Sequence, residues 1–146
     1  MAHKDECLCV DFNSLGTMLA TGGGDCKMKV WDAQRGVETN AFKAFNKPVT
    51  AVSFSLDNEY LGACSVDKSA KLWRTSTMRV AHTFTGHKDT LYACGFAYSV
   101  RWFFTGSSDR TIKSWDYAKG FCANTVRRRG ERVDELHLVV LLPECL

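Results

Sequence analysis

The feature of this sequence that most constrains its fold is a repeat with a period of 42 residues. Four columns of residues recur at this spacing, and no insertion or deletion breaks the register. These columns are Asp25, Asp67 and Asp109; Trp31, Trp73 and Trp115; Phe12, Phe54 and Phe96; and Leu19, Leu61 and Phe103. A fixed period of this length predicts that the chain is built from copies of one small structural unit.

Each unit contains four short stretches with the character of β-strands, separated by Gly and Asx residues that favour turns. The expected strands are 7–12, 17–22, 28–32 and 37–42; 49–54, 59–64, 70–74 and 79–84; and 91–96, 101–106, 111–116 and 121–126. One four-stranded antiparallel sheet per repeat is the blade of a β-propeller. The sequence therefore predicts an all-β fold of three blades, at about 1–43, 44–85 and 86–126. Three blades do not close a ring, so we expect an open, incomplete propeller.

The third unit, GHKDTLYACGFAYSVRWFFTGSSDRTIKSWD (86–116), resembles a WD40 repeat, with Gly-His at its start and Trp-Asp at its end. The resemblance implies a hydrogen-bonded tetrad of His, Thr, Asp and Trp in two of the units. Its members are His3, Thr21, Asp25 and Trp31 in the first unit and His87, Thr105, Asp109 and Trp115 in the third. Such a tetrad gives every buried polar group a partner, so we expect its role to be structural.

The second unit departs from this pattern and retains only a partial set, Asp67 and Trp73. Phe45 and Ala63 stand where the other units have His and Thr, and Arg74 replaces the final Asp. We expect apolar packing to hold this blade in place of the polar network.

Several stretches are similar to the opening blades of autophagy-related 16-like proteins. They are LATGGGDCKMKVWD (19–32), YLGACSVDKSAKLW (60–73), HTFTGHKD (82–89) and GSSDRTIKSWD (106–116). The resemblance implies a non-catalytic scaffold in autophagy whose propeller recruits adaptors and ubiquitin-like proteins. In that family the segments that bind the lipidation complex precede the propeller, and nothing here matches them, so the tethering activity is not carried over.

Basic residues gather where the loops before each first strand and the turns between second and third strands are expected to meet. This basic rim consists of Lys4, Lys27, Lys47, Lys68, Lys88 and Arg110. It suits acidic peptides, ubiquitin-like proteins or phosphates; the alternative is that these residues only solvate the surface. With a net charge of +3, we expect neither nucleic-acid binding nor membrane insertion.

The cysteines and histidines do not form a recognisable catalytic or metal site. The chain has seven cysteines, but no spacing typical of zinc or of a disulfide framework. Cys7 and Cys9 share columns with apolar residues, which favours core packing over a metal pair. We therefore expect no enzyme, no cofactor and no metal. The odd cysteine count without a secretory signal indicates a reducing compartment, and we expect a cytoplasmic protein.

The repeat register stops after Val126, and the tail (127–146) contains no fourth copy. Two interpretations of the tail stay open: Val133, Leu136 and Leu138 form one strand of an incomplete blade, or the tail is a splice or gene-model artefact. An alternative to the scaffold function is a truncated product without independent function. Exposed outer flanks of the end blades would favour self-association. A rival function is a WD40 subunit of an RNA-processing or other multiprotein complex. It would need the basic rim to bind RNA with a steep salt dependence, and aromatic residues beside the rim would support it, of which only Phe45 offers itself.

Overall fold

The computed structural model describes residues 3–98 and 101–127. Within these residues the chain forms three antiparallel sheets of four strands each and no helix. Blade 1 contains β1 (Cys7–Phe12), β2 (Met18–Gly23), β3 (Lys27–Asp32) and β4 (Val37–Lys43); blade 2 contains β5 (Val49–Phe54), β6 (Tyr60–Ser65), β7 (Ala70–Arg74) and β8 (Arg79–Phe84); blade 3 contains β9 (Leu91–Phe96), β10 (Trp102–Ser107), β11 (Thr111–Asp116) and β12 (Phe121–Arg127). This confirms the predicted all-β fold, with strand ends that lie within one residue of those expected.

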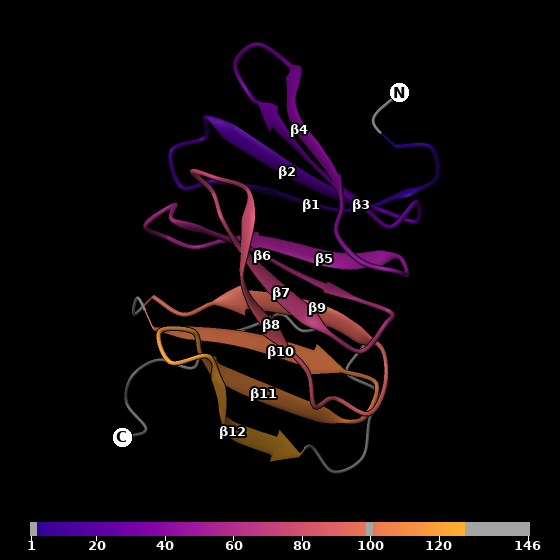
Figure 1. Cartoon of the computed structure of the whole chain (residues 1–146), viewed down its shortest axis with the longest axis vertical. Coiled ribbons are helices and arrows are strands. Elements are labelled where there is room, and N and C mark those ends of the chain that lie inside the picture. Colours follow the sequence, from indigo (N-terminus) through magenta and orange to yellow (C-terminus); the bar gives the residue numbers. More distant parts are fainter. Residues whose placement is uncertain (1–2, 99–100, 128–146) are drawn as a thin grey trace.

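The three sheets stack on one another in chain order, from indigo to yellow in Figure 1. Each is a simple meander in which consecutive strands pair. The first strand of each blade packs on the first strand of the next, because β5 contacts β1 and β2 while β9 contacts β5 and β6. The described part of the chain is thus an unclosed stack. Apart from Arg127, which ends β12, the predicted tail lies outside the described residues.

The turns between second and third strands repeat an unusual backbone conformation. Cys26, Lys68 and Arg110 have φ values of 64°, 72° and 66°, although this left-handed region is unfavourable for residues other than glycine. In each turn, the aspartate that precedes the left-handed residue accepts a hydrogen bond from the backbone N–H of the residue that follows it. In blade 3, for example, the backbone N–H of Thr111 donates to Asp109 at 2.9 Å. These side-chain bonds hold the turns closed.

Two apolar cores lie between the blades. Leu61 and Trp73 of blade 2 pack with Val30 of blade 1 in the first core. In the second core, Leu72 of blade 2 packs with Phe103 of blade 3. Because blade 2 contributes to both cores, its stability is coupled to that of both neighbours.

Blade 1 exposes the face that blade 2 buries and blade 3 partly buries. Val10 and Phe12 are 59% and 57% exposed, whereas their counterparts in blade 2, Val52 and Phe54, are each 7% exposed because blade 1 covers them. Cys7 is also exposed, so its expected core packing is wrong, since no described blade precedes blade 1 to cover it. Cys9, by contrast, packs against the first core.

Candidate functional site

In blade 1 the four side chains of the predicted tetrad lie in one chain of hydrogen bonds. Trp31 Nε1 donates to Thr21 Oγ1 at 3.0 Å. His3 Nε2 lies 2.9 Å from the same hydroxyl, and His3 Nδ1 lies 2.9 Å from Asp25 Oδ1. Since a carboxylate only accepts, Nδ1 carries the proton and Nε2 accepts from the threonine. The chain therefore ties the loop before β1 to strands β2 and β3.

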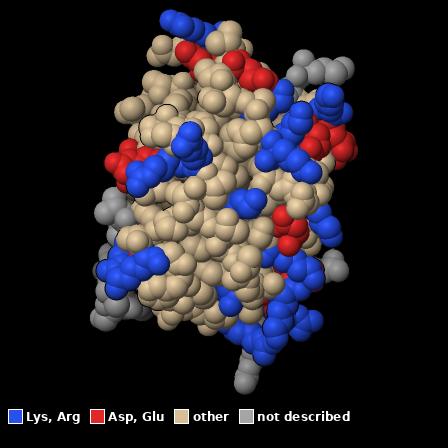
Figure 2. All heavy atoms as spheres, viewed as in Figure 1, with Lys and Arg blue, Asp and Glu red and all other residues tan. Residues whose placement is uncertain are grey.

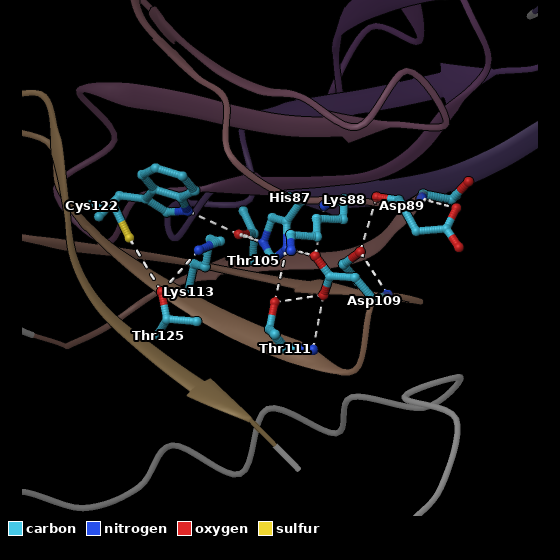
Figure 3. A network of polar contacts seen from close by, with 12 residues as sticks. His87, Lys88, Asp89, Thr105, Asp109, Thr111, Lys113, Cys122 and Thr125 are labelled. Atoms are coloured by element: carbon cyan, nitrogen blue, oxygen red, sulfur yellow. Dashed lines mark hydrogen bonds and ion pairs between the residues drawn. The ribbon is translucent and has the colours of Figure 1, made fainter. Parts of the chain in front are cut away.

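Blade 3 repeats this network with an additional hydroxyl (Figure 3). Trp115 Nε1 donates to Thr105 Oγ1 at 2.8 Å. His87 Nε2 lies 2.8 Å from the same hydroxyl, and His87 Nδ1 lies 2.9 Å from Asp109 Oδ2. Thr111 donates its hydroxyl to Asp109 Oδ1 at 2.5 Å and lies 3.1 Å from His87 Nδ1. Its position corresponds to Ser69 in blade 2 and Lys27 in blade 1, a column that the sequence analysis did not single out.

Asp109 is held in its ionised form by its surroundings. Burial alone would raise its pKa, but hydrogen bonds from the Thr111 hydroxyl, the Lys88 backbone N–H and His87 lower the pKa from 3.8 to about 2. Burial lowers the pKa of His87 below 6.5; Asp109 opposes this shift, and the charge of Lys113 adds to it. The imidazole is therefore neutral at pH 7, as the hydrogen-bond chain requires.

A hydroxyl, an imidazole and a carboxylate in a row resemble a catalytic triad, but the position of the hydroxyl argues against that role. Thr105 is fully buried, and its oxygen already receives the indole N–H of Trp115. A nucleophile must be within reach of a substrate, and this one is enclosed by the blade. The geometry supports a structural role for both tetrads.

Blade 2 replaces the polar network with aromatic packing. Phe45 is buried and meets Trp73 edge to face, with ring centroids 5.8 Å apart. Asp67 instead accepts from the backbone N–H and the hydroxyl of Ser69, at 3.0 and 2.5 Å. Because Phe45 lies in the core, the expectation that it could stack on RNA bases is wrong.

The basic rim lies at one end of the stack, on the right in Figures 1 and 2. Five of its six residues are exposed, and Lys27 is half-buried. Figure 2 shows acidic side chains between the basic ones over the upper two blades and a denser basic group at the lower right, over blade 3. The rim is therefore not uniformly basic.

The dense basic group borders a cavity of about 220 Å³ in blade 3. Its lining residues come from the loop before β9, the β10–β11 turn and strands β11 and β12. They are Gly86, Lys88, Asp109, Thr111, Lys113, Thr125 and Arg127. The sequence analysis named only Lys88 and Asp109 of these, although Lys113 occupies a visible column with Lys29 and Lys71.

Other site types find no support in the described ranges. Among residues 3–98 and 101–127, no group of three or more His, Cys, Asp or Glu is placed to hold a metal ion. The same ranges contain no α-helix with the length and apolar character of a membrane span.

Comparison with known proteins assigns the repeats. The family model described as "WD domain, G-beta repeat" matches residues 1–32, 36–74 and 78–116. The solved structures of U3-55K and of the RRP9 WD40 repeats superpose with TM-scores of 0.87 and 0.86, each covering 90% of this chain and 42% of the other. Both are 20% identical in sequence, a level that establishes the fold alone.

Three curated relatives illustrate the range of sequence similarity. Protein tipD of Dictyostelium discoideum is 44% identical over 124 residues, which cover 85% of this chain and 20% of the relative. Autophagy-related protein 16 of Arabidopsis thaliana is 33% identical over 86% of this chain and 25% of the relative. Nuclear distribution protein nudF of Aspergillus flavus is 32% identical over 83% of this chain and 27% of the relative. The chain spans about a fifth to a quarter of the length of these relatives.

Proposed function

We propose that this chain, which belongs to the WD40 repeat family, is a protein-interaction scaffold that acts in autophagy, without catalysing a reaction. The observation that carries the proposal is the burial of the His and Thr side chains within blades 1 and 3, where each His is hydrogen-bonded to the Asp of its turn. These groups hold loops in place, which leaves the loop surface of the rim to meet a partner. WD40 scaffolds present such surfaces to other proteins.

The link to autophagy rests on sequence similarity. The similarity to autophagy-related protein 16 of Arabidopsis thaliana extends over 86% of this chain. Nuclear distribution protein nudF is almost as similar, so the proposal also draws on the stretches at 19–32, 60–73 and 82–89 that resemble autophagy-related 16-like proteins. By that resemblance, the proposed partners are adaptors and ubiquitin-like proteins in the cytoplasm.

A binding measurement tests this function. Surface plasmon resonance would record the binding of ubiquitin and of the ubiquitin-like modifiers of autophagy to the immobilised 146-residue chain. Charge reversal at the rim, Lys68→Glu with Arg110→Glu, should weaken binding about tenfold, because both side chains are exposed at the turn tips. Arg35→Gln is the control, because Arg35 is also exposed but lies in the β3–β4 turn at the opposite end, and glutamine removes its charge without placing a second acid beside Asp32.

Two results would refute the proposal. One is that none of these proteins binds, and the other is that the rim and control variants bind equally well. If single-stranded RNA binds instead, with an affinity that falls steeply with salt, the RNA-processing alternative would replace the present proposal.

A further inference from the structure

We propose that the cavity at the outer edge of blade 3 binds a phosphoryl group carried on an extended segment of a partner protein. The inference rests on the proposed role as an interaction module, but it concerns a different surface from the tips of the rim turns. It assigns a specific chemistry, a phosphorylated peptide, to one pocket.

The charge of the cavity favours an anion. Its lining has three cations, Lys88, Lys113 and Arg127, and one carboxylate, Asp109. Both oxygens of Asp109 already accept hydrogen bonds, Oδ1 from Thr111 and Oδ2 from the Lys88 backbone N–H and His87. The carboxylate therefore holds the turn and keeps its negative charge, so the three cations give the lining a net charge of +2 that favours an anion. Among the described residues, none of the three takes part in an ion pair.

Lys113 differs from its counterparts in the other blades. In blade 1, Lys29 pairs with Glu38 at 2.5 Å. In blade 2, Lys71 donates to the Ala44 carbonyl at 3.0 Å and lies 5.1 Å from the centre of the Phe45 ring. In blade 3, the described partner of Lys113 Nζ is the Thr125 hydroxyl, at 2.8 Å.

Two substitutions in the repeat account for this difference. Cys122 occupies the position that corresponds to Glu38, and His87 occupies the position that corresponds to Phe45. The first change removes the acid that would neutralise the lysine, and the second removes the aromatic ring beneath it. Blade 3 therefore has neither the glutamate that pairs with Lys29 nor the phenylalanine ring that contacts Lys71. Figure 3 shows His87 and Cys122, which stand at these positions, together with Lys113.

The size of the cavity narrows the class of ligand. A volume of about 220 Å³ lies below the range of roughly 300–1,000 Å³ typical of pockets for drug-sized molecules. A nucleotide or a redox cofactor is thus too large. A phosphoryl group is small and doubly charged, and its oxygens can accept from the cations and from the hydroxyls of Thr111 and Thr125.

The adjacent strand favours a peptide as the carrier of the phosphoryl group. β12 is the outermost strand of blade 3, and among the described strands it pairs only with β11. Its other edge presents backbone N–H and C=O groups that an extended peptide can pair with. Thr125 and Arg127 belong both to this strand and to the cavity lining. A peptide added along β12 would therefore bring a phosphorylated side chain to the pocket.

Fluorescence anisotropy with a short labelled phosphoserine peptide tests the inference on the 146-residue chain. The same peptide with serine, and with glutamate, at the phosphorylated position provides the comparison at a fixed pH. We expect the phosphopeptide to bind at least about tenfold more tightly than either, because charge-assisted bonds are roughly twice as strong as neutral ones and a dianion meets three cations.

The variants Lys113→Met and Arg127→Gln should each weaken phosphopeptide binding about tenfold. Lys71→Met is the matched control at the equivalent position of blade 2, and it should bind as the wild type does. Should Lys113→Met fail to fold, Arg127→Gln carries the same test, because Arg127 is exposed at the end of β12.

Equal binding of the three peptides, or wild-type affinity in both cavity variants, would overturn the inference. Binding of single-stranded RNA or of vesicles containing a phosphoinositide that depends on Lys113, without binding of the phosphopeptide, would also overturn it. Failure of phosphopeptide binding while ubiquitin-like proteins still bind would leave the proposed function standing. The reverse result, phosphopeptide binding without binding of ubiquitin-like proteins, would refute the proposed function in autophagy and leave the phosphoryl site standing.

Discussion

Replacing Asp109 with alanine should destabilise the protein far more than the same change at Asp67. Both aspartates occupy the turn between the second and third strands of their blades. Asp109 accepts hydrogen bonds from His87, from the backbone N–H of Lys88 and from both the backbone and the hydroxyl of Thr111. Asp67 accepts only from the backbone and the hydroxyl of Ser69 among the described residues.

The difference can be estimated from these contacts. His87 is buried, so the loss of its acceptor costs about 1–3 kcal/mol. The backbone donors at the turn are closer to solvent and are partly rehydrated, so each of the remaining bonds contributes about 0.5–1 kcal/mol. Asp109→Ala, which removes the His87 bond and three others, should therefore cost about 2.5–6 kcal/mol, whereas Asp67→Ala, which removes two bonds, should cost about 1–2 kcal/mol.

Urea unfolding followed by tryptophan fluorescence measures both values. Asp109→Asn is an informative third variant, because it is nearly isosteric and keeps one acceptor oxygen, so its cost should lie between the other two. If Asp67→Ala destabilises the protein as much as Asp109→Ala, the argument that polar networks hold blade 3 while packing holds blade 2 is wrong.

Four further predictions concern pH, turns, packing and association. Because the pKa of His87 is lowered below its usual 6.5, folding stability should be complete above about pH 6.5 and should fall as the pH is lowered from 6.5 to 5.0. The urea midpoint measured as a function of pH should show this fall in the wild type and a smaller fall in His87→Gln. The same pH profile in both proteins would contradict the prediction. Arg110→Gly should stabilise the protein by about 1 kcal/mol, while Gly36→Ala, at φ 66° with open space around it, should cost about 1 kcal/mol by the same assay. Gly62→Ala places a methyl 2.6 Å from Phe103 Cε2 and should cost about 1–3 kcal/mol of stability. Phe103→Leu should partly rescue this variant, and a double mutant whose cost is the sum of the two single costs would disprove the clash. Val10→Lys should reduce self-association in sedimentation velocity, because Val10 lies on the exposed flank of blade 1.

Much of the fold is predictable from the repeat, because each column contains three residues at equivalent positions and so gives three indications of whether that position is buried, polar or in a turn. The tetrad positions follow from the resemblance of the first and third units to WD40 repeats, and strand ends differ from expectation by one residue at most. Cys7 shows the limit of this reasoning. Its column is apolar in the other blades, where Val49 and Leu91 are buried, but no described blade precedes Cys7 to cover it. A column cannot show whether a neighbouring blade is present.

The cavity was not predicted for a different physical reason. Lys29, Lys71 and Lys113 form one column, which alone suggests three equivalent surface lysines. Their partners come from other columns, namely those of Glu38 and Phe45, and the consequence of changing both in blade 3 appears only once the strands are paired. The left-handed backbone conformation of Lys68 and Arg110 was not predicted, because neither is a residue type that marks this conformation.

The central claim is that these three blades form one folded array that can present its loops to a partner. Size-exclusion chromatography with light scattering, combined with a thermal melt of the same sample, tests it most directly. The account predicts a single discrete species, monomer or small oligomer, that melts in one cooperative transition, because blade 2 shares a core with each neighbour. Aggregate, or a monomer without a cooperative transition, would contradict the claim and would assign the binding function to a longer arrangement of blades.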